Sequence, residues 1–306
     1  MGRYIIRRLL WTFLTLFGVS LLTFVLIFAG PTDPANALVG ERAQGVSVEH
    51  VRQQYGLDQP LYVQYLKYMG NLLQGNLGDS FYFRRPVAEA LLEKFPATAL
   101  LSVSIILVAV LIGIPMGTVA ALKHNSLVDR GFMIFQLLTI SLPTFFLGLL
   151  MIYFFAFRLG WFPVGGHGTF SHLILPTLSV ALPWSAWYAI FLRSNLLDVT
   201  GADYVRTAYA KGLGQKLVVL RHMLRNALLP VLTMVGMDLA TLLTGIALVE
   251  YIFNWPGIGW QALQAAQHLD VPLIMGSVLF AAALIGVGNL LVDLLYTWLD
   301  PRVQLE

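Results

Sequence analysis

The stretch DYVRTAYAKGL, residues 203–213, says most about how this chain is organised. It lies inside a polar, basic segment that separates two apolar stretches. Thr200 and Asp203 have the Ser/Thr-x-x-Asp/Glu spacing that caps the start of a helix. Lys211 followed by Gly212 is typical of a last helical turn with a left-handed cap. The pattern predicts a helix of roughly eleven residues, about 16 Å long.

The predicted helix has a narrow side that another protein could grip. Ala208 and Gly212 stack at i and i+4, with Thr207 and Lys211 beside them. Arg206 or Lys211 could pair with acidic or carbonyl groups in a partner's groove. A simple connection between two membrane spans needs none of these features, so the sequence predicts a docking helix for a cytoplasmic partner.

The sequence after this helix is amphipathic. Its leucines fall on one side over residues 215–226, so we expect a second helix along the inner membrane surface. Pro230 would mark the junction of that helix with the next span. Arg221 and Arg225 fit the ordinary anchoring of an inner loop better than a specific contact.

The composition places most of the chain in a membrane. Hydrophobic residues make up 58% of the 306 residues and charged residues only 11%, against about 25% charged residues in soluble proteins. A bilayer span needs about 20 apolar residues, and Pro143 and Pro183 could bend two of the spans. We predict an all-α integral membrane protein with six transmembrane helices, at residues 9–30, 95–122, 131–157, 172–192, 228–249 and 271–299.

Lysine and arginine predict the orientation of these spans. With both termini in the cytoplasm, the internal segments hold most cations, and Arg158 is the only one in the short external loops. The net charge of +3 therefore indicates topology rather than nucleic-acid binding. The expected organisation is an N-terminal segment with the first anchor (1–30), an external segment with short helices (31–94), a transmembrane core (95–299) with a cytoplasmic loop (193–227), and a cytoplasmic tail (300–306).

The external segment is too long and too patterned for a bare connection. Pro60 could open a helix that runs to about Leu73, and Pro86 suits the first position of another helix before Lys94. The segment could be a structural collar or part of a platform for a binding protein, and the residues favour neither interpretation.

No catalytic or metal site stands out in the sequence. A phosphate-binding loop needs Gly-x-x-x-x-Gly-Lys-Ser/Thr, and no lysine here precedes Ser or Thr. The chain has no cysteine and six scattered histidines. His167 and His172 are better explained as loop or interfacial residues than as metal ligands. We therefore expect no cofactor on this chain, and any energy for active transport must enter through a partner at the docking helix.

A carboxylate inside a predicted span needs an explanation. Asp238 should face protein or water, because a charge there costs about 2.5–3.5 kcal/mol on insertion scales. With Thr241 and Thr244 nearby it could line a translocation pathway, and a buried hydrogen bond between helices fits equally well. Trp184 and Tyr188 have two interpretations of the same kind, lining of the passage or aromatic packing of the fourth span.

Two runs in the basic segment resemble the cytoplasmic coupling loop of ABC importer permeases of the dipeptide/oligopeptide/nickel family. They are RTAYAKGL at residues 206–213 and RHMLRNALLP at residues 221–230. Trp260 and Val271 depart from residues that relatives often carry, and both lie outside the coupling loop. Further matches extend over nearly the whole chain: GLDQPL (56–61), GNLG (75–78), IFNWPGIG (252–259) and NLLVDLLY (289–296).

The resemblance implies a type I ABC importer permease that forms half of a pore. It also implies a second homologous permease, two ABC ATPases that bind ATP and magnesium, an external substrate-binding protein and surrounding membrane lipids. Short peptides are the expected substrate class, with nickel, glutathione or another small solute as alternatives; a secondary transporter or a membrane scaffold fits less well. The residues assigned to ATPase coupling are Arg206, Thr207, Ala208, Ala210, Lys211, Gly212 and Leu213, with His222, Arg225, Asn226 and Pro230 in support.

Overall fold

The computed structural model describes residues 2–28, 52 and 58–299. The described residues form a helical bundle with one short antiparallel pair of strands, β1 (Asp79–Ser80) and β2 (Arg85–Pro86). The helices in chain order are α1 (Gly2–Phe28), α4 (Leu61–Leu73), α5 (Val87–Leu122), α6 (Leu127–Ser141), α7 (Thr144–Met151), the π-helix η1 (Ile152–Arg158), α8 (Phe170–Thr200), α9 (Asp203–Ala210), α10 (Gln215–Val218), the π-helix η2 (Val219–Met223), α11 (Leu224–Leu242), α12 (Ala247–Ile252), α13 (Ile258–Gln267) and α14 (Val271–Leu299).

Five described helices are long and apolar enough to cross a membrane: α1, α5, α8, the continuous run from α10 to α11, and α14. A sixth span exists if α6 is counted together with α7 and η1. This confirms the helical, multi-span fold predicted from the sequence. The predicted tail (300–306) and most of the N-terminal half of the external segment lie outside the described residues.

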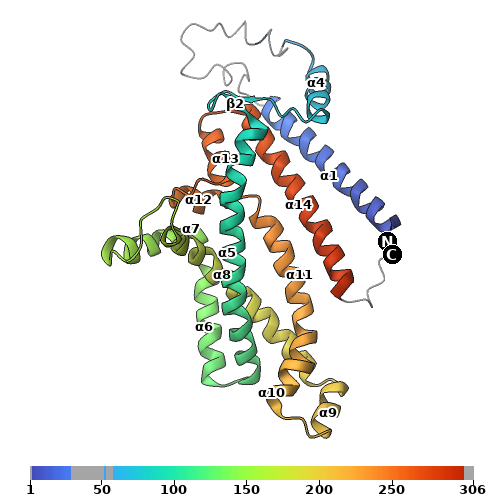
Figure 1. The fold of residues 1–306 in the computed structure, drawn as a ribbon, viewed down its shortest axis with the longest axis vertical. Helices are drawn as coiled ribbons and strands as arrows, with labels where there is room; N and C mark the ends of the chain where they lie inside the picture. The colour runs from blue at the N-terminus through green and yellow to red at the C-terminus, as the bar shows by residue number, and fades with distance from the viewer. Residues whose placement is uncertain (1, 29–51, 53–57, 300–306) are drawn as a thin grey trace.

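The third span is broken rather than straight. The α6 helix and the α7–η1 pair meet at an angle of 99°, and α7 with η1 runs sideways out of the bundle in Figure 1. Leu142 adopts an extended conformation (φ −94°, ψ 131°) directly before Pro143. Because a proline disfavours helical geometry in the residue before it, the predicted bend at Pro143 is confirmed as a break. In contrast, α8 continues through Pro183.

Two predicted helix boundaries are wrong. The helix expected before Lys94 and the span expected from residue 95 form one helix, α5, which follows Pro86 directly. Residues 215–242 are likewise one continuous helical run, with Pro230 inside α11 rather than at a junction. Proline is tolerated inside a membrane helix because local adjustments and neighbouring groups can satisfy the freed backbone carbonyls.

The α5 and α8 helices form the tightest contact of the bundle. A Cβ atom at Gly113 would lie 2.7 Å from the backbone oxygen of Ser185, and one at Gly117 would lie 2.6 Å from that of Ala189. Small residues spaced by four let membrane helices approach backbone to backbone. The two helices therefore behave as one rigid pair.

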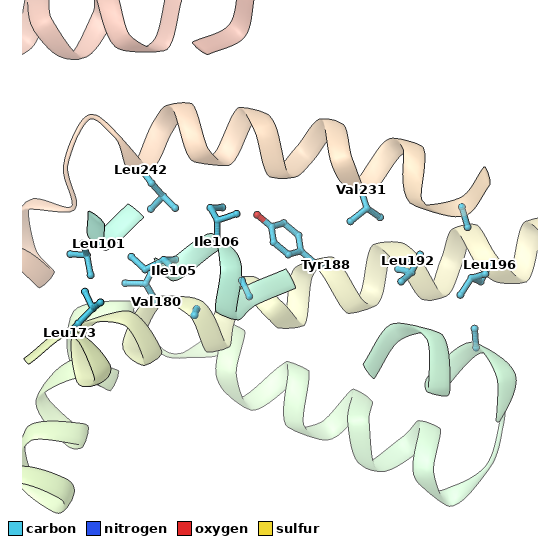
Figure 2. Packing of buried hydrophobic residues seen from close by; sticks show 14 of the residues in the cluster. Leu101, Ile105, Ile106, Leu173, Val180, Tyr188, Leu192, Leu196, Val231 and Leu242 are labelled. Carbon is cyan, nitrogen blue, oxygen red and sulfur yellow. The ribbon is translucent and has the colours of Figure 1, made fainter. Parts of the chain in front are cut away.

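The main core lies between this pair and α11. Tyr188 and Leu192 on α8 are fully buried, as is Val231 on α11. Figure 2 shows the Tyr188 ring between the two helices, with its hydroxyl pointing toward α11. In Figure 1, α9 and α10 lie at one end of the bundle, whereas α13 and β2 lie at the opposite end.

Candidate functional site

A helix is present where the docking helix is predicted, and it is shorter than expected. It is α9, eight residues long, and Ala202 precedes it without any side-chain capping bond. Thr200 belongs to α8, where its hydroxyl donates to the Leu196 carbonyl oxygen at 2.7 Å. The predicted capping role of Thr200 is therefore wrong, because α8 extends through Thr200 and Ala202 takes the N-cap position of α9. Asp203 in the first turn still suits the positive end of the helix dipole.

The end of α9 has the predicted glycine cap. Gly212 has φ +79°, a left-handed conformation that glycine adopts without strain. Its N–H donates to the Tyr209 oxygen at 2.9 Å, and the N–H of Leu213 donates to the Ala208 oxygen at 3.3 Å. This pair of hydrogen bonds is the six-residue C-cap arrangement of α-helices. The predicted left-handed cap is confirmed.

The face of α9 predicted to meet a partner is partly wrong. Ala208 is buried together with Val205 against the chain's own core. The residues left exposed are Arg206, Thr207, Ala210 and Lys211, with Tyr204 and Tyr209 around them. We name the exposed set Tyr204, Arg206, Thr207, Tyr209, Ala210, Lys211 and Gly212 the α9 surface.

The inner side of α9 explains how the α9 surface is held. Val218, Val219 and Met223 are buried in the same cluster as Val205 and Ala208. Leu213 packs half-buried against this cluster. The α9 helix is thus attached by apolar packing to the run from α10 to α11 and by a two-residue link to α8, so a displacement of α9 must displace both spans.

The predicted supporting residues lie beside this packing rather than in it. Arg225 and Asn226 are exposed and His222 is half-buried. The Asn226 amide donates to the His222 carbonyl oxygen at 3.3 Å. Pro230 is exposed inside α11. The structure gives these four residues no contact that would make them part of the α9 surface, so their role stays a prediction.

The predicted pathway residues are only partly brought together. The Tyr188 hydroxyl donates to Asp238 Oδ2 at 2.9 Å, which joins α8 to α11. Thr241 donates to the Met237 oxygen and Thr244 to the Thr241 oxygen, so both hydroxyls are bonded within their own helix segment. Trp184 packs half-buried against the core. Of the alternatives for Asp238, the hydrogen bond between helices is present in the structure.

A buried ion pair near the α9 end was missed from the sequence. Asp129 is fully buried at the start of α6 and accepts from Arg193 of α8, at 2.7 Å from Nε and 2.8 Å from a terminal nitrogen. The Asn125 N–H adds a bond of 2.9 Å. The Ser126-x-x-Asp129 spacing was a visible signal, since Ser126 caps α6.

A second buried carboxylate, Glu250 of α12, was also missed. It is fully buried, and burial raises its pKa while the Trp260 N–H and the Thr98 hydroxyl, which donate to it, oppose that shift. Its side-chain partner, Thr98, lies 152 residues earlier in the chain, so no local spacing marks the pair. Together with the Asp129 pair, it shows that the α5–α8 pair is joined to peripheral elements at both of its ends.

These features define the class of protein: a multi-span membrane protein with a short, partly exposed helix, α9, held at one end of the bundle. Two family models match, "Binding-protein-dependent transport system inner membrane component" over residues 113–305 and "Binding-prot-dependent transport system membrane comp, N-term" over residues 1–102. The chain belongs to this family of binding-protein-dependent transport system inner membrane components. It is a multi-pass inner-membrane permease subunit of an ABC importer and not itself an enzyme, and it works with ATPase and substrate-binding partners.

Curated relatives match over the full length. The glutathione transport system permease protein GsiC of Escherichia coli (strain K12) is 41% identical over 304 residues, which cover 99% of each chain. The oligopeptide transport system permease protein AppB of Bacillus subtilis (strain 168) is 38% identical over 315 residues, which cover 99% of this chain and 100% of the relative. The inward-facing MetNI methionine ABC transporter has a similar fold, with a TM-score of 0.56 and 17% identity, over 70% of this chain and 97% of that chain.

Proposed function

We propose that this chain forms half of the pore of an importer for short peptides. The supporting observation is that two full-length relatives, 41% and 38% identical, are named for the transport of glutathione and of oligopeptides. Glutathione is a tripeptide, so both names describe peptide substrates. Of the alternatives suggested by the family resemblance, which are nickel, glutathione and another small solute, the names of these two relatives favour glutathione.

The second half of the pore would be a homologous permease subunit. Asp238 is only half-buried in this chain although it lies in a span. A carboxylate at that depth needs protein or water around it. A second subunit against α11 would supply either more protein or a shared aqueous passage. Asp238, Thr241, Thr244 and Trp184 are proposed to lie along that passage.

Two ABC ATPases would dock on the cytoplasmic end, one of them on the α9 surface. This surface is polar and aromatic, and buried apolar packing holds it against α10 and η2. ATP and magnesium would bind to the ATPases and not to this chain. Hydrolysis would then displace α9 as a rigid body and, through it, the spans α8 and α11.

The test is uptake by proteoliposomes that contain the permease pair, the ATPases and the binding protein. We expect ATP-dependent uptake of a labelled di- or tripeptide, competed by unlabelled peptide or glutathione and not by nickel. Uptake of nickel without peptide uptake would overturn the substrate class. Uptake driven by an ion gradient without ATP would overturn the importer mechanism in favour of a secondary transporter.

A further inference from the structure

Glu250 lies in the short helix pair α12–α13 between the spans α11 and α14, at the end of the bundle opposite α9 (Figure 1). Its side chain is fully buried. Thr98 of α5 donates its hydroxyl to Glu250 Oε1 at 3.0 Å, and the N–H of Trp260 donates to Oε2 at 2.8 Å. Neither donor is a cation, so this carboxylate is held by dipoles alone.

The same contacts supply the cap that α13 lacks. Gly257 precedes this helix and has no side chain to cap it. Instead, the Ile258 N–H donates to the Thr98 hydroxyl oxygen at 2.8 Å, and the Trp260 N–H donates to Glu250. Two first-turn amides of α13 are therefore satisfied by side chains from α5 and α12, and the carboxylate lies at the positive end of the α13 dipole.

Two glycines make room for this contact. A Cβ atom at Gly257 would lie very close to both Glu250 and Thr98, and one at Gly259 would lie 2.7 Å from the Ala247 nitrogen. Gly257 has φ −99°, which any residue can adopt. Glycine is needed at position 257 for close approach and not for its backbone conformation, which marks the contact between the carboxylate and the helix as specifically accommodated.

A second contact keeps the α12–α13 pair attached to α5 without the carboxylate. The Trp255 indole N–H donates to the Ala97 oxygen at 2.9 Å, and Trp255 is buried. Loss of the Glu250 contact should therefore loosen the orientation of α13 without detaching the pair. A variant of Glu250 can therefore change the position of α13 while the α12–α13 pair stays folded against α5.

We propose that Glu250 is a positioning residue for transport, because it makes the α12–α13 pair move as one body with α5. This inference rests on the proposed function, in which ATPase motion enters at the α9 surface. The α8 helix leads directly into α9, and α5 is packed against α8 at Gly113 and Gly117. The contact at Glu250 extends this rigid pair to the far end of the bundle, so that docking of the ATPases and closure of that end are mechanically linked.

The test uses the assembled importer with Glu250→Gln, Thr98→Val and Thr98→Ser. Glutamine keeps the volume and one acceptor oxygen, whereas valine removes the hydroxyl that serves both Glu250 and Ile258. For Glu250→Gln and Thr98→Val we expect normal co-purification of the ATPases and normal basal hydrolysis. The ATP consumed per peptide imported should rise about tenfold, as expected for the loss of one hydrogen bond to a charged group. Thr98→Ser, which keeps the hydroxyl, should restore the wild-type ratio.

A second readout follows the α12–α13 pair directly. A cysteine at the exposed Gln267 of α13 should react with a thiol reagent at a rate that changes when ATP hydrolysis is trapped. In the Glu250→Gln background this nucleotide dependence should disappear, while a cysteine at the exposed Gln74, after α4, serves as the reference site. An unchanged ATP-to-peptide ratio, or a loss of assembly in step with transport, would overturn the proposal. Failure of the proposed function would give a different result, since the retention of the ATPases on co-purification would then not depend on the α9 surface.

Discussion

Substituting Gly212 separates the backbone geometry of the α9 surface from its contact with a partner. Gly212 has φ +79°, and a residue with a Cβ atom loses roughly 1–2 kcal/mol in that conformation. Among the described residues no heavy atom lies within 4 Å of the position a Cβ would take, and Gly212 is exposed, so we expect a larger side chain to extend into solvent. Gly212→Ala and Gly212→Trp should therefore weaken the cap of α9 by the same amount.

The two variants should differ only where a partner surrounds position 212. If the backbone strain raises the free energy of the docked geometry by about 1.4 kcal/mol, the population of that geometry falls about tenfold. Gly212→Ala should therefore keep measurable transport. Gly212→Trp should abolish transport and the retention of the ATPases on co-purification. Expression and membrane insertion should be normal for both variants, because the glycine lies outside the spans.

The chain contains a matched control for this comparison. Gly75 ends α4 with φ +78°, with nothing within 4 Å of its Cβ position. The same two hydrogen bonds form there, from Gly75 N–H to the Leu72 oxygen at 2.9 Å and from Asn76 N–H to the Asn71 oxygen at 3.0 Å. Gly75→Trp should leave ATPase retention unchanged. If Gly212→Trp retains the ATPases and transports as well as Gly212→Ala, the α9 surface is not the docking site.

Three further outcomes are expected. In intact cells a cysteine at Gln267 should react with an impermeant thiol reagent and one at Gln215 should not, since the chain has no native cysteine; the reverse pattern would contradict the predicted orientation. Gly117→Val should lower the thermal stability of the purified complex by about 1–3 kcal/mol, because its Cβ would lie 2.6 Å from a backbone oxygen of α8; unchanged stability would mean that α5 and α8 can separate at little cost. Tyr188→Phe removes a hydrogen bond between helices and should lower the stability of the complex by about 0.6–1.7 kcal/mol. Asp238→Asn still accepts that bond and should lower the stability less in the same melting assay. A larger loss of stability for the asparagine variant would show that the charge itself is needed.

Local signals in the sequence predicted the helical, multi-span fold and the cap of α9 correctly. Long apolar stretches specify helices in a membrane because every backbone group there must be satisfied within the helix. The Lys-Gly pair predicted the left-handed cap at Gly212 because few residues other than glycine adopt that conformation readily. Both signals depend on neighbouring residues only, so they could be identified without knowledge of the packing.

The misplaced face of Ala208 and the missed Glu250 share one physical cause, which is that burial depends on partners distant in sequence. The helical period placed Ala208 on a small-residue face, but only packing against α10 and η2 shows that this face points inward. Pro230 predicts a junction from local rules, whereas the continuous run through α11 tolerates it. Glu250 is paired with a residue 152 positions earlier, a distance at which no spacing rule operates.

The same distant contacts explain how a small docking helix could act across the whole bundle. The α9 helix follows α8 after a link of two residues. The backbone contact at Gly117 then couples α8 to α5, and Glu250 couples α5 to α13. Each of these two links is short, one a backbone contact and the other a set of buried hydrogen bonds to Glu250. We therefore expect a displacement of α8 to be passed on to α5 and α13 with little loss.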